Sequence, residues 1–224
     1  GNKSDCEITP MATGGAIHIG GNCNSTFENC VISGNSFTDE MTGTGGGIYA
    51  HFNATGSVSF KNCTITSNAA HFGAGIASQG AVELTFDNCT IKNNVAETNA
   101  GGILMDTGSH VTVIDSTVTH NSSYIGGGIM VSGFETMGTV VSSTISQNNA
   151  TFYAAGVALL DNSSVFLINC VNQGNSAAQF GGGLYIHQGC NATISGGAII
   201  GNQAGQNGYP AKSGAWTSQG SISV

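Results

Sequence analysis

Residues 73–94 have the sequence GAGIASQGAVELTFDNCTIKNN, and this stretch contains every element of a pattern that repeats along the chain. Three small residues precede an aliphatic residue, a Phe-x-Asn-Cys segment follows, and an asparagine closes the unit. In the preceding copy, residues 57–60 and 63–66 alternate apolar and polar side chains, which is the two-residue period of a half-buried strand. The unit therefore predicts short strands separated by turns that contain glycine and asparagine.

Three columns of residues define the repeat. The aliphatic residue after the small triplet advances by 31, 28, 27, 26, 28 and 27 positions. This aliphatic column contains Ile17, Ile48, Ile76, Ile103, Ile129, Val157 and Leu184, and residues 213–216 begin an eighth copy. The Phe-x-Asn-Cys segment starts at Phe27, Phe60 and Phe86 and is less complete in later copies. The asparagine column contains Asn35, Asn68, Asn94, Asn121, Asn148, Asn175 and Asn202.

A unit of about 27 residues has room for three short strands and three turns, and a single unit cannot bury its own apolar face. Stacked units place equivalent residues one strand spacing apart, about 4.8 Å. The sequence thus predicts an all-β, right-handed parallel β-helix of about seven to eight coils, with three short strands per coil. We expect one domain over residues 1–224, with a repeat body over about 11–224 that is open at its C-terminal end and belongs to a longer chain.

The asparagine column is predicted to lie in a turn, where stacked amides hydrogen-bond from coil to coil. Its recurrence in every coil indicates a structural ladder, because a catalytic asparagine has no reason to recur.

Charge and composition restrict the partners. The net charge is −8, the chain contains no arginine, and only 7% of its residues are charged. An acidic chain without a basic patch is not expected to bind nucleic acid or anionic membranes. The sequence contains no run of 18 apolar residues, so membrane insertion is not expected.

These repeats resemble the pectate-lyase-like superfamily of right-handed parallel β-helices. Residues 14–17 match the Gly-Gly-Ala-Ile motif of polymorphic outer-membrane protein repeats, which algal and protist surface β-helix proteins share. The second motif of those repeats, Phe-x-x-Asn, is replaced here by Phe-x-Asn-Cys. The resemblance implies a surface-exposed passenger, adhesin or fibre, and no catalytic residues. It also implies that lyases of the superfamily commonly use an arginine base, which this chain lacks.

We expect no enzyme activity, no cofactor and no metal site, because the twelve acidic residues are scattered over different columns and no metal-binding spacing occurs. His18, His51 and His187 closely follow the aliphatic column and are expected to be solvated.

Sequons and cysteines indicate an extracellular or cell-surface location. The nine candidate N-glycosylation sites are Asn2, Asn24, Asn53, Asn62, Asn88, Asn121, Asn149, Asn162 and Asn191. Seven cysteines leave at least one thiol unpaired, and the candidate disulfides are Cys6–Cys23 and Cys170–Cys190. One inward column contains Cys30, Cys63, Cys89 and Cys170, where packing as small apolar side chains is favoured.

The main functional hypothesis is a structural, glycosylated rod outside the cell, whose partners are other copies stacked end to end, as in a fibril, or adjoining domains of the same chain. The alternative is an adhesin or glycan-binding module that uses a strand face or an insertion, found at residues 36–44 and 203–213. A polysaccharide-active enzyme and an ice-binding protein are further alternatives. The latter rests on two outward rows: Thr64, Thr90, Thr117 and Thr144, then Thr66, Lys92, Thr119 and Ser146.

Overall fold

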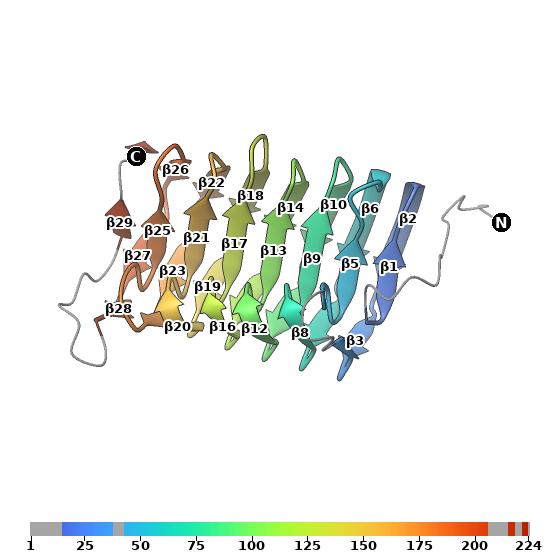
Figure 1. Cartoon of the computed structure of the whole chain (residues 1–224), viewed down its shortest axis with the longest axis horizontal. Helices are drawn as coiled ribbons and strands as arrows, with labels where there is room; N and C mark the ends of the chain where they lie inside the picture. Colours follow the sequence, from blue (N-terminus) through green and yellow to red (C-terminus); the bar gives the residue numbers. More distant parts are fainter. Residues whose placement is uncertain (1–14, 38–42, 206–214, 218–220, 224) are drawn as a thin grey trace.

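The computed structural model describes residues 15–37, 43–205, 215–217 and 221–223. Within these residues the chain forms strands and turns, and its coils stack side by side along one axis (Figure 1). Each strand pairs in parallel with its equivalents in the neighbouring coils, so four sheets run along the stack. This confirms the predicted all-β parallel β-helix.

The four sheets are named A to D in the order in which a coil passes through them. Sheet A comprises β1 (Ile17–Ile19), β5 (Ile48–Ala50), β9 (Ile76–Gln79), β13 (Ile103–Asp106), β17 (Ile129–Ser132), β21 (Val157–Leu160), β25 (Leu184–Ile186) and β29 (Ala215–Thr217). Sheet B comprises β2 (Asn22–Glu28), β6 (Thr55–Lys61), β10 (Glu83–Asp87), β14 (His110–Ile114), β18 (Met137–Val141), β22 (Ser164–Ile168), β26 (Asn191–Ser195) and β30 (Ser221–Ser223). Sheet C comprises β3 (Val31–Ser33), β7 (Thr64–Thr66), β11 (Thr90–Lys92), β15 (Thr117–Thr119), β19 (Thr144–Ser146), β23 (Val171–Gln173) and β27 (Ala198–Ile200). Sheet D comprises β4 (Ser36–Phe37), β8 (Ala69–Phe72), β12 (Val95–Asn99), β16 (Ser122–Ile125), β20 (Asn149–Tyr153), β24 (Ser176–Ala177) and β28 (Gln203–Ala204).

The prediction of three strands per coil was wrong, because each coil has a fourth strand in sheet D. This strand follows the asparagine of each unit, where the sequence shows little apolar alternation. In β12 only Ala96 is buried, and the register shifts at the end of the strand. A strand that buries one small side chain and then bends carries too weak a hydrophobic period to be recognised.

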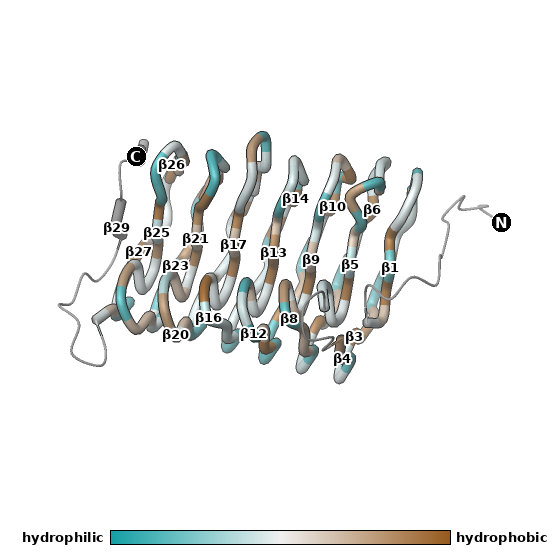
Figure 2. Tube along the Cα trace, in the orientation of Figure 1, coloured by the Kyte–Doolittle hydropathy of each residue, from teal (hydrophilic) through white to brown (hydrophobic). Residues whose placement is uncertain are grey.

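The core is made of columns that point inward from sheets A, B and C. Ile76, Ile103 and Ile129 pair across neighbouring strands and are fully buried. The rings of Phe27, Phe60 and Phe86 stack with centroid distances of 4.8 and 5.0 Å. Hydrophobic residues therefore recur at equivalent positions of successive coils (Figure 2).

The asparagine column lies at the turn between sheets C and D and forms a buried ladder. The Asn94 side-chain Oδ1 accepts hydrogen bonds from the Asn68 backbone N–H (3.0 Å) and from Asn68 Nδ2 (3.0 Å). Asn94 Nδ2 in turn donates to Asn121 Oδ1 (2.9 Å) and to the Ile65 carbonyl (3.1 Å). Amide-to-amide hydrogen bonds join every successive pair from Asn35 to Asn202.

The small triplet is needed because it lies directly against this ladder. A Cβ on Gly75 would be 2.5 Å from the carbonyl oxygen of Gly102 and 3.0 Å from Asn94 Nδ2. Only glycine allows the backbone of the next coil to approach so closely. The asparagine ladder therefore requires glycine beside it, which explains why both columns recur together.

The Phe-x-Asn-Cys segment is explained by the turn between sheets B and C. Asn29, Asn62 and Asn88 have φ angles of 56°, 52° and 50°, in the left-handed region that asparagine tolerates best after glycine. The preceding phenylalanine and the following cysteine point inward on either side of this turn.

Candidate functional site

The outer face of sheet A is covered by a second apolar cluster, separate from the core of the rod. Its floor consists of outward side chains that are almost fully buried, such as Tyr49, Leu104 and Met130. The ends of the sheet D strands form a wall beside this floor, and Ile125 and Tyr153 of that wall pack against it. Side chains from sheets A and D therefore converge on this side of the rod.

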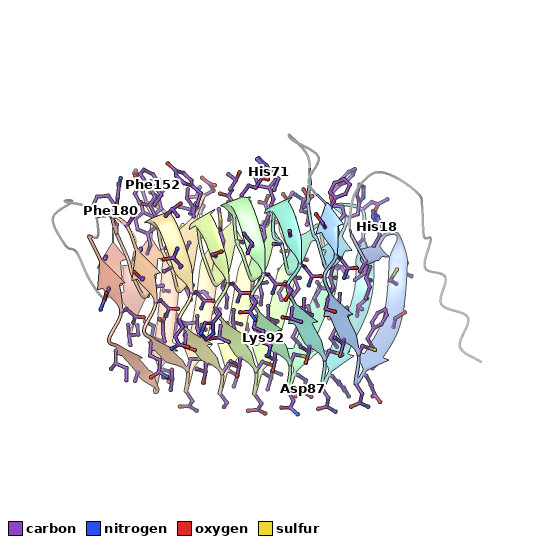
Figure 3. All side chains as sticks on the ribbon, turned by 90° about the horizontal axis from the view of Figure 1, so that it is seen from below. His18, His71, Asp87, Lys92, Phe152 and Phe180 are labelled. Atoms are coloured by element: carbon purple, nitrogen blue, oxygen red, sulfur yellow. The ribbon has the colours of Figure 1, made fainter. Side chains whose placement is uncertain are left out.

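A lane of aromatic side chains begins in this cluster and continues beyond it. Tyr124 and Phe152 stack at a centroid distance of 4.8 Å, and Phe152 lies 3.7 Å from Tyr153. Tyr153 also contacts Phe180 and Tyr185, each at 5.4 Å. We call these five residues the aromatic lane. Phe152 and Phe180 project from one edge of the rod in Figure 3, and Tyr124 is 42% exposed.

A line of polar side chains runs along the ends of the sheet A strands, next to the same cluster. The Tyr49 hydroxyl donates to Gln79 Oε1 at 2.8 Å. Asp106 follows in the next coil, where its Oδ1 accepts from the backbone N–H of Thr107 at 2.7 Å. The Asp161 carboxylate accepts a hydrogen bond from the Ser132 hydroxyl at 2.8 Å.

Asp106 and Asp161 differ in their environments. Burial raises the pKa of the Asp106 carboxyl, hydrogen bonds from Thr107 oppose this shift, and the negative charge of Asp161 adds to it. The negative charge of Asp161 acts on Asp106 although the two residues lie 55 positions apart in the sequence, because they stand at the ends of β13 and β21, two coils apart in sheet A. A carboxyl whose pKa is raised near a second carboxyl group is a candidate for general acid and base catalysis.

The histidines next to the aliphatic column also lie on this side. The His18 and His51 rings stack at a centroid distance of 5.7 Å, and Tyr49 contacts both rings edge to face. His187 lies 6.3 Å from the ring of Tyr185. Among the described residues there is no group of three or more histidine, cysteine, aspartate or glutamate side chains that could hold a metal ion.

A hollow of about 360 Å³ lies at the turn between sheets C and D in the later coils. It is lined by Ser146, Gln147, Gln173, Gly174, Ile200 and Gly201. This lining is neutral, so the hollow offers no titratable group for catalysis.

The glycosylation candidates differ in their exposure. Seven of them are exposed: Asn24, Asn53, Asn62, Asn88, Asn149, Asn162 and Asn191. Asn121 is not a usable site, because its side chain is fully buried and both polar atoms of its amide are hydrogen-bonded within the ladder. Asn2 lies outside the described residues.

The cysteines are mostly reduced. Cys170 and Cys190 are both free, so the predicted bond between them is not formed. The reason is their position: Cys170 points inward between sheets B and C, whereas Cys190 lies beyond sheet A, where the Ser163 hydroxyl is 3.7 Å from its sulfur. Cys23 is disulfide-bonded, and its predicted partner Cys6 lies outside the described residues.

Cysteine and serine occupy one inward column, in which a side chain accepts a hydrogen bond from the backbone N–H of the preceding coil. The Cys63 backbone N–H donates to Cys89 Sγ (3.4 Å), and the Cys89 N–H donates to Ser116 Oγ (2.8 Å). Burial raises the pKa of the Cys89 thiol to about 11. These thiols are therefore protonated packing groups rather than nucleophiles at neutral pH.

Sequence reasoning missed the aromatic lane and the Asp106–Asp161 pair. A signal was present, because Phe72, Tyr153 and Phe180 each stand immediately before a small triplet. Asp106 stands three residues after Ile103 of the aliphatic column. Only positions that repeat give a periodic signal, and these side chains occupy positions whose residue type changes from coil to coil.

The architecture is that of a β-solenoid with parallel sheets, and comparison with known proteins agrees. Residues 2–137 match the family described as right-handed β-helix region, and the chain belongs to that family. No curated protein and no solved structure matches the chain. The family contains both enzymes and non-enzymatic proteins. No helix among the described residues is long and apolar enough to cross a membrane.

Proposed function

We propose that this protein is a structural, glycosylated rod of an extracellular or cell-surface protein, in which the β-helix serves to build length. The observation that carries the proposal is the buried amide ladder, which joins successive coils from Asn35 to Asn202. The amide-to-amide hydrogen bonds of the ladder run between coils, so they link the coils along the axis of the rod.

The short turns support the same proposal. Two residues connect β6 to β7, and three connect β9 to β10. The sides of the rod are consequently formed by strands in register rather than by long loops. Such a surface can be extended by further coils, and two copies placed end to end would continue all four parallel sheets.

Glycosylation is supported by the exposed sequons, which lie on several sides of the rod. Asn24 and Asn191 start from sheet B, Asn53 and Asn162 lie in turns after sheet A, and Asn149 begins a strand of sheet D. Glycans at such positions would cover the lateral surface and leave the ends of the stack for assembly.

Electron microscopy of the native material, combined with intact-mass analysis before and after enzymatic deglycosylation, tests this proposal. We expect regular filaments or elongated rods whose mass falls on deglycosylation. Discrete particles of the bare chain mass, with no end-to-end contacts at any concentration, would overturn it.

A glycan-binding module is the second candidate, and the aromatic lane is the observation that favours it. Sugar rings pack against exposed aromatic side chains, and Tyr124 is such a side chain beside Phe152. A glycan array with the Tyr124→Ala variant tests this candidate. The matched control is Phe166→Ala, which removes a 37% exposed ring from sheet B. Binding that survives both changes, or is lost in both, would contradict a role for the lane.

If the same face also cleaves its ligand, Asp106 and Asp161 are the candidate acid and base, because both stand at the ends of sheet A strands whose outward side chains form the floor of the apolar cluster. We expect Asp106→Asn to abolish any cleavage while leaving binding intact. Glu135, an exposed residue in the loop after β17, provides the control through Glu135→Gln.

A further inference from the structure

Two rows of small side chains project outward from sheet C. The first row consists of Thr64, Thr90, Thr117 and Thr144, and the second of Thr66, Lys92, Thr119 and Ser146. The residue between the rows points inward in each coil, and Ile65, Ile91, Val118 and Ile145 are fully buried. The strands are therefore held in register by the core, and the eight positions of the two rows form an array that we call the hydroxyl face, in which Ser146 is only 8% exposed.

The hydroxyls of the two rows are used differently. In the second row, Thr119 Oγ1 lies 3.1 Å from Ser146 Oγ, and Thr66 Oγ1 lies 3.3 Å from Ser67 Oγ. The threonine hydroxyls of the first row form no hydrogen bond with any described residue. Each is half-exposed, so it is available to groups outside the protein.

The array has two regular spacings. Neighbouring coils place equivalent hydroxyls about 4.8 Å apart along the axis, and two residues along a strand span about 6.7 Å. These distances are close to the repeats of water oxygens on the faces of an ice crystal. Each threonine side chain also carries a methyl group beside its hydroxyl.

We propose that the hydroxyl face binds ordered water at the surface of ice. The face is rigid because its strands lie on the core beside the amide ladder, so little conformational entropy is lost on binding a rigid lattice. The first row is continuous over four coils and neutral. The second row is interrupted by Lys92, which lies near the middle of the rod (Figure 3).

The proposal requires that Asn62 and Asn88, which lie at the edge of this face, carry no glycan. Asn88 Nδ2 donates to Asn62 Oδ1 at 2.7 Å, so the amide of Asn88 is already engaged. A glycan on either residue would cover Thr64 or Thr90, which follow them by two positions. Peptide mapping of the native protein should therefore find both asparagines bare, and occupied sites there would overturn the proposal.

The direct test is thermal hysteresis and inhibition of ice recrystallisation by the unglycosylated chain. We expect activity in the wild type, an increase in Lys92→Thr, which completes the second row, and loss in Thr117→Lys, which breaks the first. Thr151→Lys is the matched control, since it makes the same change at an exposed position of β20 in sheet D. Circular dichroism confirms that each variant is folded.

Equal activity of Thr117→Lys and Thr151→Lys would overturn the proposal, as would absence of activity in both the wild type and Lys92→Thr. Crystalline cellulose is included as a second lattice of regularly spaced hydroxyls. Retention on cellulose that is lost in Thr117→Lys, without any effect on ice, would reassign the face to a polysaccharide and reject ice. None of these outcomes depends on filament formation, so the rod proposal is tested separately.

Discussion

Replacement of Asn121 by alanine tests how much the buried ladder contributes to stability. Asn121 Oδ1 accepts hydrogen bonds from the Asn94 backbone N–H (3.0 Å) and from Asn94 Nδ2 (2.9 Å). The variant Asn121→Ala leaves both donors buried without a partner, because Asn94 is fully enclosed. An unsatisfied buried donor costs about 1–3 kcal/mol, so the expected loss in the free energy of unfolding is about 2–6 kcal/mol.

Asn35→Ala is the matched control at the first position of the ladder. The Asn35 side chain donates one hydrogen bond, to Asn68 Oδ1 at 2.9 Å, and it is only half-buried. Its removal is expected to cost about 1 kcal/mol. Urea unfolding followed by circular dichroism measures both losses, and amide hydrogen exchange should show opening centred on residues 90–123 in Asn121→Ala. Equal losses in the two variants, or a loss below about 1 kcal/mol for Asn121→Ala, would refute the argument.

Three further predictions concern the packing and the titratable groups. Gly128→Ala should destabilise by about 1–3 kcal/mol in the same urea assay, because its Cβ would lie 2.6 Å from the Gly156 carbonyl oxygen. Burial raises the pKa of Cys89 from 9.0 to about 11. The contribution of the protonated thiol to the free energy of unfolding is therefore complete below pH 9, and about 2–3 kcal/mol of it is lost as the pH rises through 11. Cys89→Ser should remove this pH dependence at little cost, since Ser116 occupies the same column in the next coil; a wild-type stability that is flat between pH 8 and 11 would contradict it. Because the pKa of Asp106 is raised, the contribution of this residue to the free energy of unfolding is complete below its ordinary pKa and is lost as the pH rises. Asp106→Asn should therefore be more stable than the wild type at pH 7 but not at pH 3. A lower melting temperature of Asp106→Asn at pH 7 would show that the carboxylate is stabilising.

Much of the fold could be predicted from the sequence because the columns that repeat are those that the core and turns constrain. Ile76 and Phe86 recur because each coil must bury an equivalent side chain against the next. Asn94 recurs because each amide accepts from the coil before it and donates to the coil after it. A requirement imposed once per coil leaves a period in the sequence, and the period predicts the β-helix.

The fourth strand and the candidate sites could not be predicted in the same way. Sheet D strands bury one small side chain, such as Ala96, so they carry almost no hydrophobic period. The effect of the Asp161 charge on Asp106 depends on the register of sheet A, which aligns the ends of β13 and β21 across β17. Pairing of the cysteines likewise depends on position, since Cys170 lies between sheets B and C whereas Cys190 lies between sheets A and B.

The distinction between repeating and non-repeating positions also separates the two surfaces with proposed ligands. The hydroxyl face repeats the same small side chain at each coil, and a surface of that kind can recognise only a ligand that repeats at the same spacing. The outer face of sheet A changes from Tyr49 to Leu104 to Tyr185 along equivalent positions, although the backbone there is as regular as elsewhere. A regular backbone does not by itself require the residue type to change from coil to coil. The change must therefore come from what the individual side chains contact. A particular bound molecule is one such cause, and it predicts that exchanging Tyr185 with Leu104 would preserve the fold while abolishing glycan binding. If packing against the sheet D wall is the whole cause, the exchange would instead lower stability and leave binding by the exposed Tyr124 unchanged.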